Sequence, residues 1–117
     1  MGNPITTKLE TGTIGELLIQ LRLLEYGIQA APPIKDTGND LIAIRGKVVK
    51  FVQVKTSEKR IPARRKSSKI RDFTFLVKLK RSSHNKFLLD ESIIKVWEEN
   101  KNEVNELNQN LINKIWS

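Results

Sequence analysis

The stretch that decides the fold reads GNDLIAIRGKVVKFVQVK and spans residues 38–55. Residues 40–45 and 48–55 are rich in apolar and β-branched side chains, which indicates two β-strands. Gly46 and Lys47 between them predict a two-residue hairpin loop. Outward from this loop, the register brings Asp40 opposite Gln53, and Lys55 points to the same side of the sheet as Gln53.

This hairpin gathers a carboxylate, an amide and an ammonium group at one end of a face that is otherwise apolar. A slip of one residue in the register would send Asp40 and Gln53 to opposite faces. Polar groups in such a place are costly unless they are paired or hold a ligand. Asp40 and the carbonyl oxygen of Gln53 can bind a hard cation, and Lys55 can orient a water or stabilise negative charge. Phosphodiester hydrolysis requires these groups.

A helix is predicted from Thr13 to Tyr26, because apolar residues recur there at helical spacing and Gly27 follows. Apolar residues lie on both sides of it, so we expect both faces to pack, as in a helix laid against a sheet. If this helix covers the polar end of the hairpin, Glu16 adds a second carboxylate, as a metal ligand or a general base.

The remaining elements are expected to be short. Residues 30–33 contain two prolines and exclude helix, and residues 36–39 have turn chemistry. Residues 57–71 are expected to form a loop, and residues 73–79 and 86–89 two strands. From Asp90, taken as an N-cap, the apolar spacing predicts one or two amphipathic helices that run to the C-terminus.

The length of 117 residues favours a single domain over residues 1–117. The chain has no cysteine and one histidine, which excludes thiolate zinc sites and cysteine nucleophiles, so a metal would be held by oxygen atoms. The sequence shows no signal peptide and no apolar run long enough to span a membrane. We therefore expect a cytoplasmic protein.

The net charge of +8 is concentrated in one part of the chain. Residues 45–81 hold 14 of the 21 lysines and arginines but only two acids, Glu58 and Asp72. Such segregation indicates a surface for a polyanion, although a solvated basic loop would look the same. The candidate phosphate-binding residues are Lys59, Arg60, Arg64, Arg65, Lys66, Lys69 and Arg71.

Three short motifs in order resemble the PD-(D/E)XK nuclease superfamily: Gly12-Thr13-Ile14-Gly15-Glu16, Gly38-Asn39-Asp40 and Gln53-Val54-Lys55-Thr56. The resemblance covers residues 12–56 and looks closest to archaeal Holliday-junction-resolvase-like proteins and to the branch with Gln-x-Lys, which includes some homing endonucleases. It implies an α/β, restriction-endonuclease-like fold, in which helices flank a mixed central β-sheet.

The resemblance also implies roles for the residues of the three motifs. Glu16 corresponds to the accessory acid, Asp40 to the central metal ligand, Gln53 to a second ligand and Lys55 to the catalytic lysine. The implied activity is an endonuclease that uses Mg²⁺ or Mn²⁺ to hydrolyse duplex or branched DNA. The resemblance and the amphipathic C-terminal segment together lead us to expect a homodimer.

Gln53 departs from the common pattern, because most members carry Glu or Asp at this position. A neutral amide attracts a divalent cation less than a carboxylate does. A nuclease-fold protein that binds DNA but cleaves weakly or not at all is therefore the alternative, and a toxin or RNA-processing nuclease is a third possibility.

Each candidate residue also has a structural interpretation. Glu16 could form a capping box with Thr13, Asp40 could be a turn residue, and Gln53 with Lys55 could be the solvent face of an edge strand. His84 is expected to lie on the surface. Trp97 and Trp116 are predicted to lie on the C-terminal helix. We expect their side chains to pack in the core or in a subunit contact.

Overall fold

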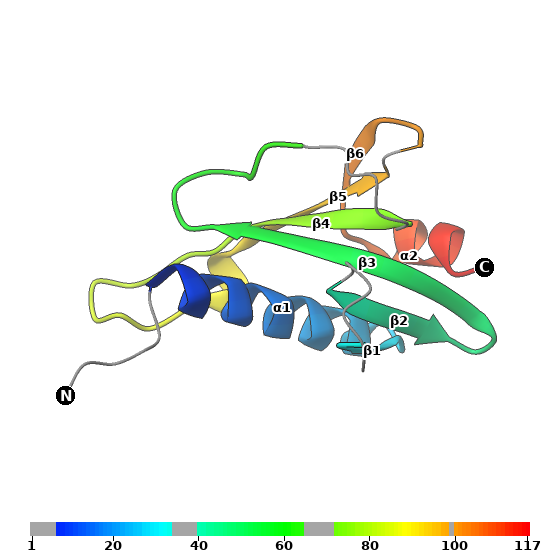
Figure 1. Ribbon diagram of the computed structural model, residues 1–117, viewed down its shortest axis with the longest axis horizontal. Helices are drawn as coiled ribbons and strands as arrows, with labels where there is room; N and C mark the ends of the chain where they lie inside the picture. Colours follow the sequence, from blue (N-terminus) through cyan, green and yellow to red (C-terminus); the bar gives the residue numbers. More distant parts are fainter. Residues whose placement is uncertain (1–6, 34–39, 65–71, 99) are drawn as a thin grey trace.

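The computed structural model describes residues 7–33, 40–64, 72–98 and 100–117. A six-stranded sheet in the order β1-β2-β3-β4-β5-β6 carries α1 along one face (Figure 1). The elements are α1 (Thr7–Glu25), β1 (Gln29–Ala31), β2 (Leu41–Arg45), β3 (Val48–Ser57), β4 (Phe73–Lys78), the 3-10 helix η1 (Leu89–Glu91), β5 (Ile93–Glu98), β6 (Glu103–Glu106) and α2 (Gln109–Ile115).

The sheet is mixed, because β3 and β4 are parallel while every other neighbouring pair is antiparallel. The connection between the two parallel strands contains residues 58–64, which form no helix or strand. The predicted α/β architecture, a mixed sheet flanked by helices, is confirmed.

The predicted hairpin is present in the predicted register. Arg45 pairs with Val48, and the ladder runs without a slip to Leu41 opposite Val52. Gly46 has a φ of 60°, which a residue with a side chain rarely adopts, so the glycine is what allows this tight loop.

The helix α1 begins at Thr7 rather than at Thr13. Thr13 is thus interior, and the capping box with Glu16 is wrong. The expectation that both faces of the helix pack is also wrong. Its buried apolar side chains are Leu18, Ile19 and Leu23, whereas the exposed ones include Leu17 at 53%, Leu21 at 43% and Leu24 at 59%.

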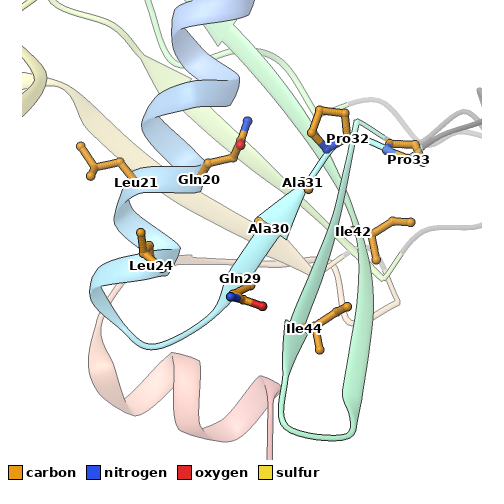
Figure 2. Close-up of a pocket in the computed structure, with 10 residues that line it drawn as sticks. All are labelled: Gln20, Leu21, Leu24, Gln29, Ala30, Ala31, Pro32, Pro33, Ile42 and Ile44. Atoms are coloured by element: carbon orange, nitrogen blue, oxygen red, sulfur yellow. The ribbon is translucent and has the colours of Figure 1, made fainter.

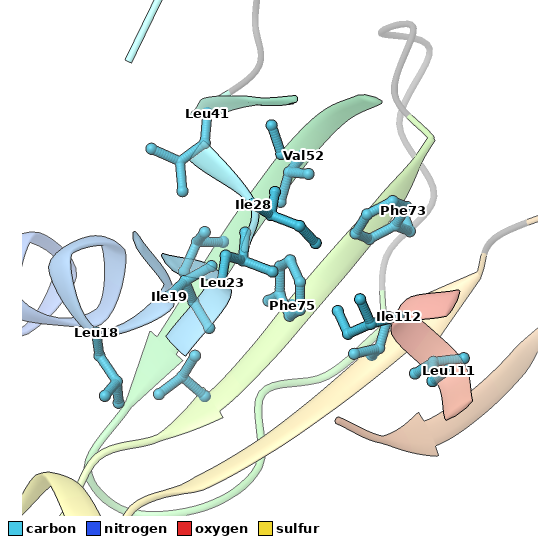
Figure 3. Packing of buried hydrophobic residues seen from close by; sticks show 14 of the residues in the cluster. Leu18, Ile19, Leu23, Ile28, Leu41, Val52, Phe73, Phe75, Leu111 and Ile112 are labelled. Carbon is cyan, nitrogen blue, oxygen red and sulfur yellow. The ribbon is translucent and has the colours of Figure 1, made fainter. Parts of the chain in front are cut away.

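The core lies between the sheet and its two helices (Figure 3). On β3, Val52 and Val54 enter this core, and the ring of Phe73 meets Trp116 of α2 edge to face at 5.1 Å. Both helices therefore cover the Val52 and Val54 face. The C-terminal helix is secured there by the indole N–H of Trp116, which donates to the carbonyl of Ala43 at 3.4 Å.

Ile93–Glu98 and Glu103–Glu106 pair as the strands β5 and β6 and do not form the predicted amphipathic helix, whereas α2 is a helix within the segment where helices were predicted. Ile93, Val96 and Trp97 fit helical spacing, but β-branched and aromatic residues also favour a strand, and pairing with β4 decides between the two. Asn102, at a φ of 50°, allows the turn.

Three smaller predictions also need correction. Asp90 belongs to η1 and caps no helix; Asn108 caps α2, where its side chain accepts from the N–H of Leu111 at 2.9 Å. The strand predicted over 86–89 is reduced to one bridge between Arg81 and Phe87. Residues 29–31, which the sequence assigned only as non-helical, form the edge strand β1. The turn predicted at residues 36–39 lies outside the described residues.

No helix in the described part of the chain is long and apolar enough to cross a membrane.

Candidate active site

Asp40 lies one residue before β2 and is held by β3 through two hydrogen bonds. Its backbone N–H donates to the carbonyl of Val52 at 3.0 Å, and its carboxylate accepts from the N–H of Val54 at 2.8 Å. The Val52 carbonyl lies opposite Leu41, so the ladder does not continue regularly to a pair of Asp40 and Gln53. The carboxylate is instead fixed beside the backbone that joins Gln53 to Lys55.

Gln53 and Lys55 are half-buried and alternate along β3 with the buried Val52 and Val54. Successive side chains of a strand point to opposite faces, so Gln53 and Lys55 project from the face that α1 does not cover. Glu16 was expected to join Gln53 and Lys55 if the helix covered their face of the sheet. The helix covers the other face, so this condition is not met.

Glu16 nevertheless approaches the site from the helix side. Burial raises the pKa of its carboxyl, and the negative charge of Asp40 raises this pKa further. Glu16 therefore lies within electrostatic range of Asp40. Asp40 thus stands directly before the start of β2, between the helix that carries Glu16 and the strand that carries Lys55.

The close approach of α1 to β3 depends on Gly15. A Cβ atom added at Gly15 would lie 1.8 Å from the hydroxyl oxygen of Thr56 and 2.8 Å from its Cβ. No side chain fits in that space, so glycine at this position lets the helix backbone rest on the strand. The motif Gly15-Glu16 therefore has a structural reason: the glycine brings the following carboxylate near Asp40.

The donor set suits a small hard cation. Among the described residues no three His, Cys, Asp or Glu side chains form a metal-binding group. The candidate ligands are the carboxylates of Glu16 and Asp40, which interact electrostatically, and the amide oxygen of Gln53 on β3. Mg²⁺ is typically bound by one or two carboxylates and retains several waters, so these residues are candidate ligands for it. A divalent cation would also relieve the repulsion that raises the pKa of Glu16.

A large hollow of the described surface lies elsewhere. It is an apolar groove of about 700 Å³ between α1, β1 and β2, lined by residues such as Leu21, Leu24, Pro32 and Ile44 (Figure 2). None of the described residues that line it is ionisable, so they offer no group for acid or base chemistry.

The basic residues expected to hold phosphate follow β3. Lys59, Arg60 and Arg64 are exposed, and they lie after Lys55 on the segment that leads towards β4. The other four, Arg65, Lys66, Lys69 and Arg71, lie outside the described residues. His84 is exposed in a turn, and Trp97 and Trp116 are buried, both as expected.

A cluster around Arg81 was not predicted. The guanidinium of Arg81 binds Glu58 at 2.8 Å and Glu10 at 2.8 Å, and Thr11 donates to Glu58 at 2.7 Å. Arg81 is the first cause of the lowered pKa of Glu58. One feature of the sequence could have indicated this cluster. Glu58 is an isolated acid in a strongly basic segment, and a single acid among cations commonly has a structural partner.

No protein family model matches the sequence, and no curated protein matches it. A solved structure described as that of a bacterial homing endonuclease, I-Ssp6803I, superposes with a TM-score of 0.54 at 22% identity. The match covers 92% of this chain and 78% of that one. The protein therefore shares its fold with a homing endonuclease.

Proposed function

We propose that the protein is a DNA endonuclease of the PD-(D/E)XK type that hydrolyses phosphodiester bonds with Mg²⁺ or Mn²⁺. The observation that carries the proposal is the position of Asp40, fixed on Val54 between Gln53 and Lys55 and close enough to Glu16 to raise its pKa. The fold shared with a homing endonuclease supports it.

Asp40, Glu16 and the amide oxygen of Gln53 would hold the metal, which would polarise the phosphate and acidify a bound water. Lys55 would orient that water or stabilise the charge that develops on the phosphate oxygens. Glu16, if it is not a ligand, would accept the proton from the water, since its raised pKa makes it a better base than an ordinary glutamate.

The basic segment after β3 supports DNA as the substrate. Lys59, Arg60 and Arg64 are exposed within a few residues of Lys55, where they can bind the backbone that flanks the cleaved phosphate. Contacts of this kind provide affinity but little sequence information. Selectivity for branched DNA is therefore tested by comparing cleavage of linear and branched substrates.

The decisive experiment compares Asp40→Ala with Asp72→Ala. Asp72 also binds the backbone of β3, because its carboxylate accepts from the N–H of Phe51 at 2.7 Å, so it controls for the loss of that type of bond. Labelled linear, nicked, flapped and four-way-junction DNA, together with RNA, are incubated with each protein and Mn²⁺. We expect Asp40→Ala to abolish cleavage while retaining DNA binding, and Asp72→Ala to cleave. Full activity of Asp40→Ala contradicts the proposal.

A second candidate function is DNA binding without efficient cleavage. The observation in its favour is the neutral Gln53, which leaves two carboxylates for the cation. Calorimetric titration with Mg²⁺ and Mn²⁺ separates the two functions. No metal binding up to millimolar concentration, together with salt-sensitive DNA binding, would favour the second.

The active form is proposed to be a homodimer. The described residues that line the groove, among them Leu21, Leu24 and Ile44, include no charged side chain, so the groove adds no local charge repulsion to the contact of two copies. Light scattering of the wild type and of Leu24→Glu tests this. A monomeric wild type contradicts it.

A further inference from the structure

Arg81 joins three elements that lie far apart in the sequence. Its guanidinium binds Glu10 on α1 and Glu58 at the end of β3, each at 2.8 Å, with a second bond to Glu58 at 3.2 Å. It also lies over the ring of Phe87, 4.2 Å from the ring centre. The Arg81 side chain is 19% exposed, so the planar group is held on several sides.

Between residues 10 and 15, where side chains of the first half of α1 are described, apolar anchorage is sparse. The large buried side chains of the helix, Leu18, Ile19 and Leu23, all follow Gly15. Between residues 10 and 15, the buried side chain is that of Thr11, and Ile14 is partly buried. Over residues 10–15, the contact at Gly15 and the polar cluster around Arg81 therefore contribute to the placement of the helix.

The backbone connects both acids of this cluster to residues of the candidate site. Glu10 precedes Glu16 by six residues, which is about 9 Å along a helix. Glu58 follows Lys55 by three residues, which is about 10 Å along a strand. A bridge between Glu10 and Glu58 thus fixes the helix that carries Glu16 relative to the strand that carries Lys55.

We infer that Arg81 is a positioning residue for the candidate metal site: by joining Glu10 to Glu58, it holds the first half of α1 against β3 and so places Glu16 near Asp40. This role rests on the proposed function, because it presumes that Glu16 and Asp40 hold a metal together.

The sign of the expected effect distinguishes positioning from simple electrostatics. Removal of a positive charge near a cation site, by Coulomb's law alone, tightens cation binding. Loss of a positioning residue weakens it, because Glu16 is no longer held near Asp40. Outer residues that orient metal ligands typically contribute about 10–100-fold in metal affinity.

The test measures Mn²⁺ binding by calorimetry without DNA, so that it does not depend on cleavage. Arg81→Met removes the guanidinium but keeps an apolar side chain against Phe87. The matched control is Arg22→Met, because Arg22 also binds two carboxylates, Glu25 at 2.9 Å and Asp90 at 2.8 Å, at the other end of α1. We expect Arg81→Met to weaken Mn²⁺ binding by at least about 10-fold and Arg22→Met to leave it within about 2-fold.

Hydrogen exchange in the same proteins provides a second readout. Arg81→Met is expected to accelerate exchange of the α1 amides between Gly15 and Leu18 more than that of the amides after Leu18, where the apolar anchors begin. Arg81→Lys, which keeps the charge but lacks the planar fork, is expected to bind Mn²⁺ with intermediate affinity.

Equal or tighter Mn²⁺ binding by folded Arg81→Met overturns the inference. If that variant does not fold, Glu10→Gln decides, because it weakens the bond to the helix and leaves Arg81 bound to Glu58; unchanged Mn²⁺ affinity then overturns it. A wild-type protein that does not bind Mn²⁺ is a different result: it contradicts the proposed metal site itself, and the role of Arg81 with it.

Discussion

The carboxylate of Asp40 accepts a hydrogen bond from the backbone N–H of Val54 at 2.8 Å. The ladder between β2 and β3 ends at Leu41 opposite Val52. β2 therefore has no further backbone carbonyl to accept from the next N–H of β3 that points toward it, which is the N–H of Val54. Asp40 takes that place with its side chain. One carboxylate thus completes the sheet and serves the candidate site, and its two functions can be separated by mutation.

We expect Asp40→Ala to destabilise the protein by about 1 kcal/mol, because the Val54 N–H loses its acceptor. Asp40→Asn keeps a carbonyl oxygen for that bond and should be close to the wild type in stability, while both variants lose Mn²⁺ binding. Urea unfolding and calorimetry measure the two effects. Equal stability of Asp40→Ala and the wild type would show that the bond to Val54 does not support the sheet.

Gly15→Ala tests the close packing of α1 on β3. The added methyl group overlaps the hydroxyl of Thr56, so we expect a loss of about 1–3 kcal/mol in the free energy of unfolding. Displacement of the helix should also weaken Mn²⁺ binding, since Glu16 moves with it. Thermal unfolding and calorimetry are the measurements.

Gly12→Ala is the matched control for Gly15→Ala. Gly12 lies on the same helix and a Cβ atom added there meets nothing within 4 Å, so alanine should stabilise the helix by about 0.5–1 kcal/mol. If the two alanines have the same effect, the contact with Thr56 is not the reason for glycine at position 15.

The sequence was sufficient to predict the hairpin, because a two-residue loop fixes the register and the alternation of apolar residues admits no slip. It was not sufficient at Asp40, where the ladder gives way to a bond from a side chain to the backbone. The helix side of the site was also misjudged. Glu16 reaches Asp40 from the opposite face, which depends on how closely α1 packs at Gly15, a tertiary property.

The segment from Ile93 to Glu106 was predicted as helix because its apolar residues fit helical spacing. The same residues are also compatible with a strand. Pairing with β4, which is distant in the sequence, decides in favour of strands. The cluster of Arg81 with Glu10 and Glu58 could not be predicted for a similar reason, since it needs the positions of three elements at once.

Glu16 should make stability depend on pH. Because its pKa is raised in the folded protein, the folded state binds its proton more tightly than the unfolded state. The stability linked to this proton is fully present below the ordinary pKa of 4.5 and is lost as the pH rises through the raised value. Glu16→Gln should therefore be more stable than the wild type at pH 7, and the difference should vanish at acid pH.

Metal should make the wild type more stable than Glu16→Gln at pH 7. A divalent cation stabilises the ionised Glu16 of the wild type, whereas the variant offers the cation one carboxylate fewer. Urea unfolding across the pH range, with and without Mn²⁺, measures both effects. Glu103→Gln, at an exposed position on β6, controls for the change in net charge. A metal-free Glu16→Gln that is less stable at pH 7 contradicts the prediction.

Gln53→Glu should tighten Mn²⁺ binding by about 10-fold or more, because a carboxylate attracts the cation with a full charge. Without metal, the variant should be less stable than the wild type, because a further carboxylate adds repulsion near Asp40 and Glu16. Gln109→Glu adds the same charge at an exposed position on α2 and should change neither property much. Similar calorimetric affinities for the two variants would exclude Gln53 as a metal ligand.

The last prediction concerns the basic segment after β3. Lys59→Gln with Arg60→Gln should weaken binding to DNA of any sequence and leave the cleavage rate at saturating DNA unchanged, since these side chains would bind backbone phosphate and not the reacting groups. The slope of log affinity against log salt should become shallower by about 1–2, near one unit for each phosphate that the variant no longer neutralises. Lys101→Gln with Lys114→Gln removes the same charge elsewhere on the surface. If both double variants lose affinity and slope to the same extent, DNA responds to the net charge of +8, and the segment after β3 is not its binding site.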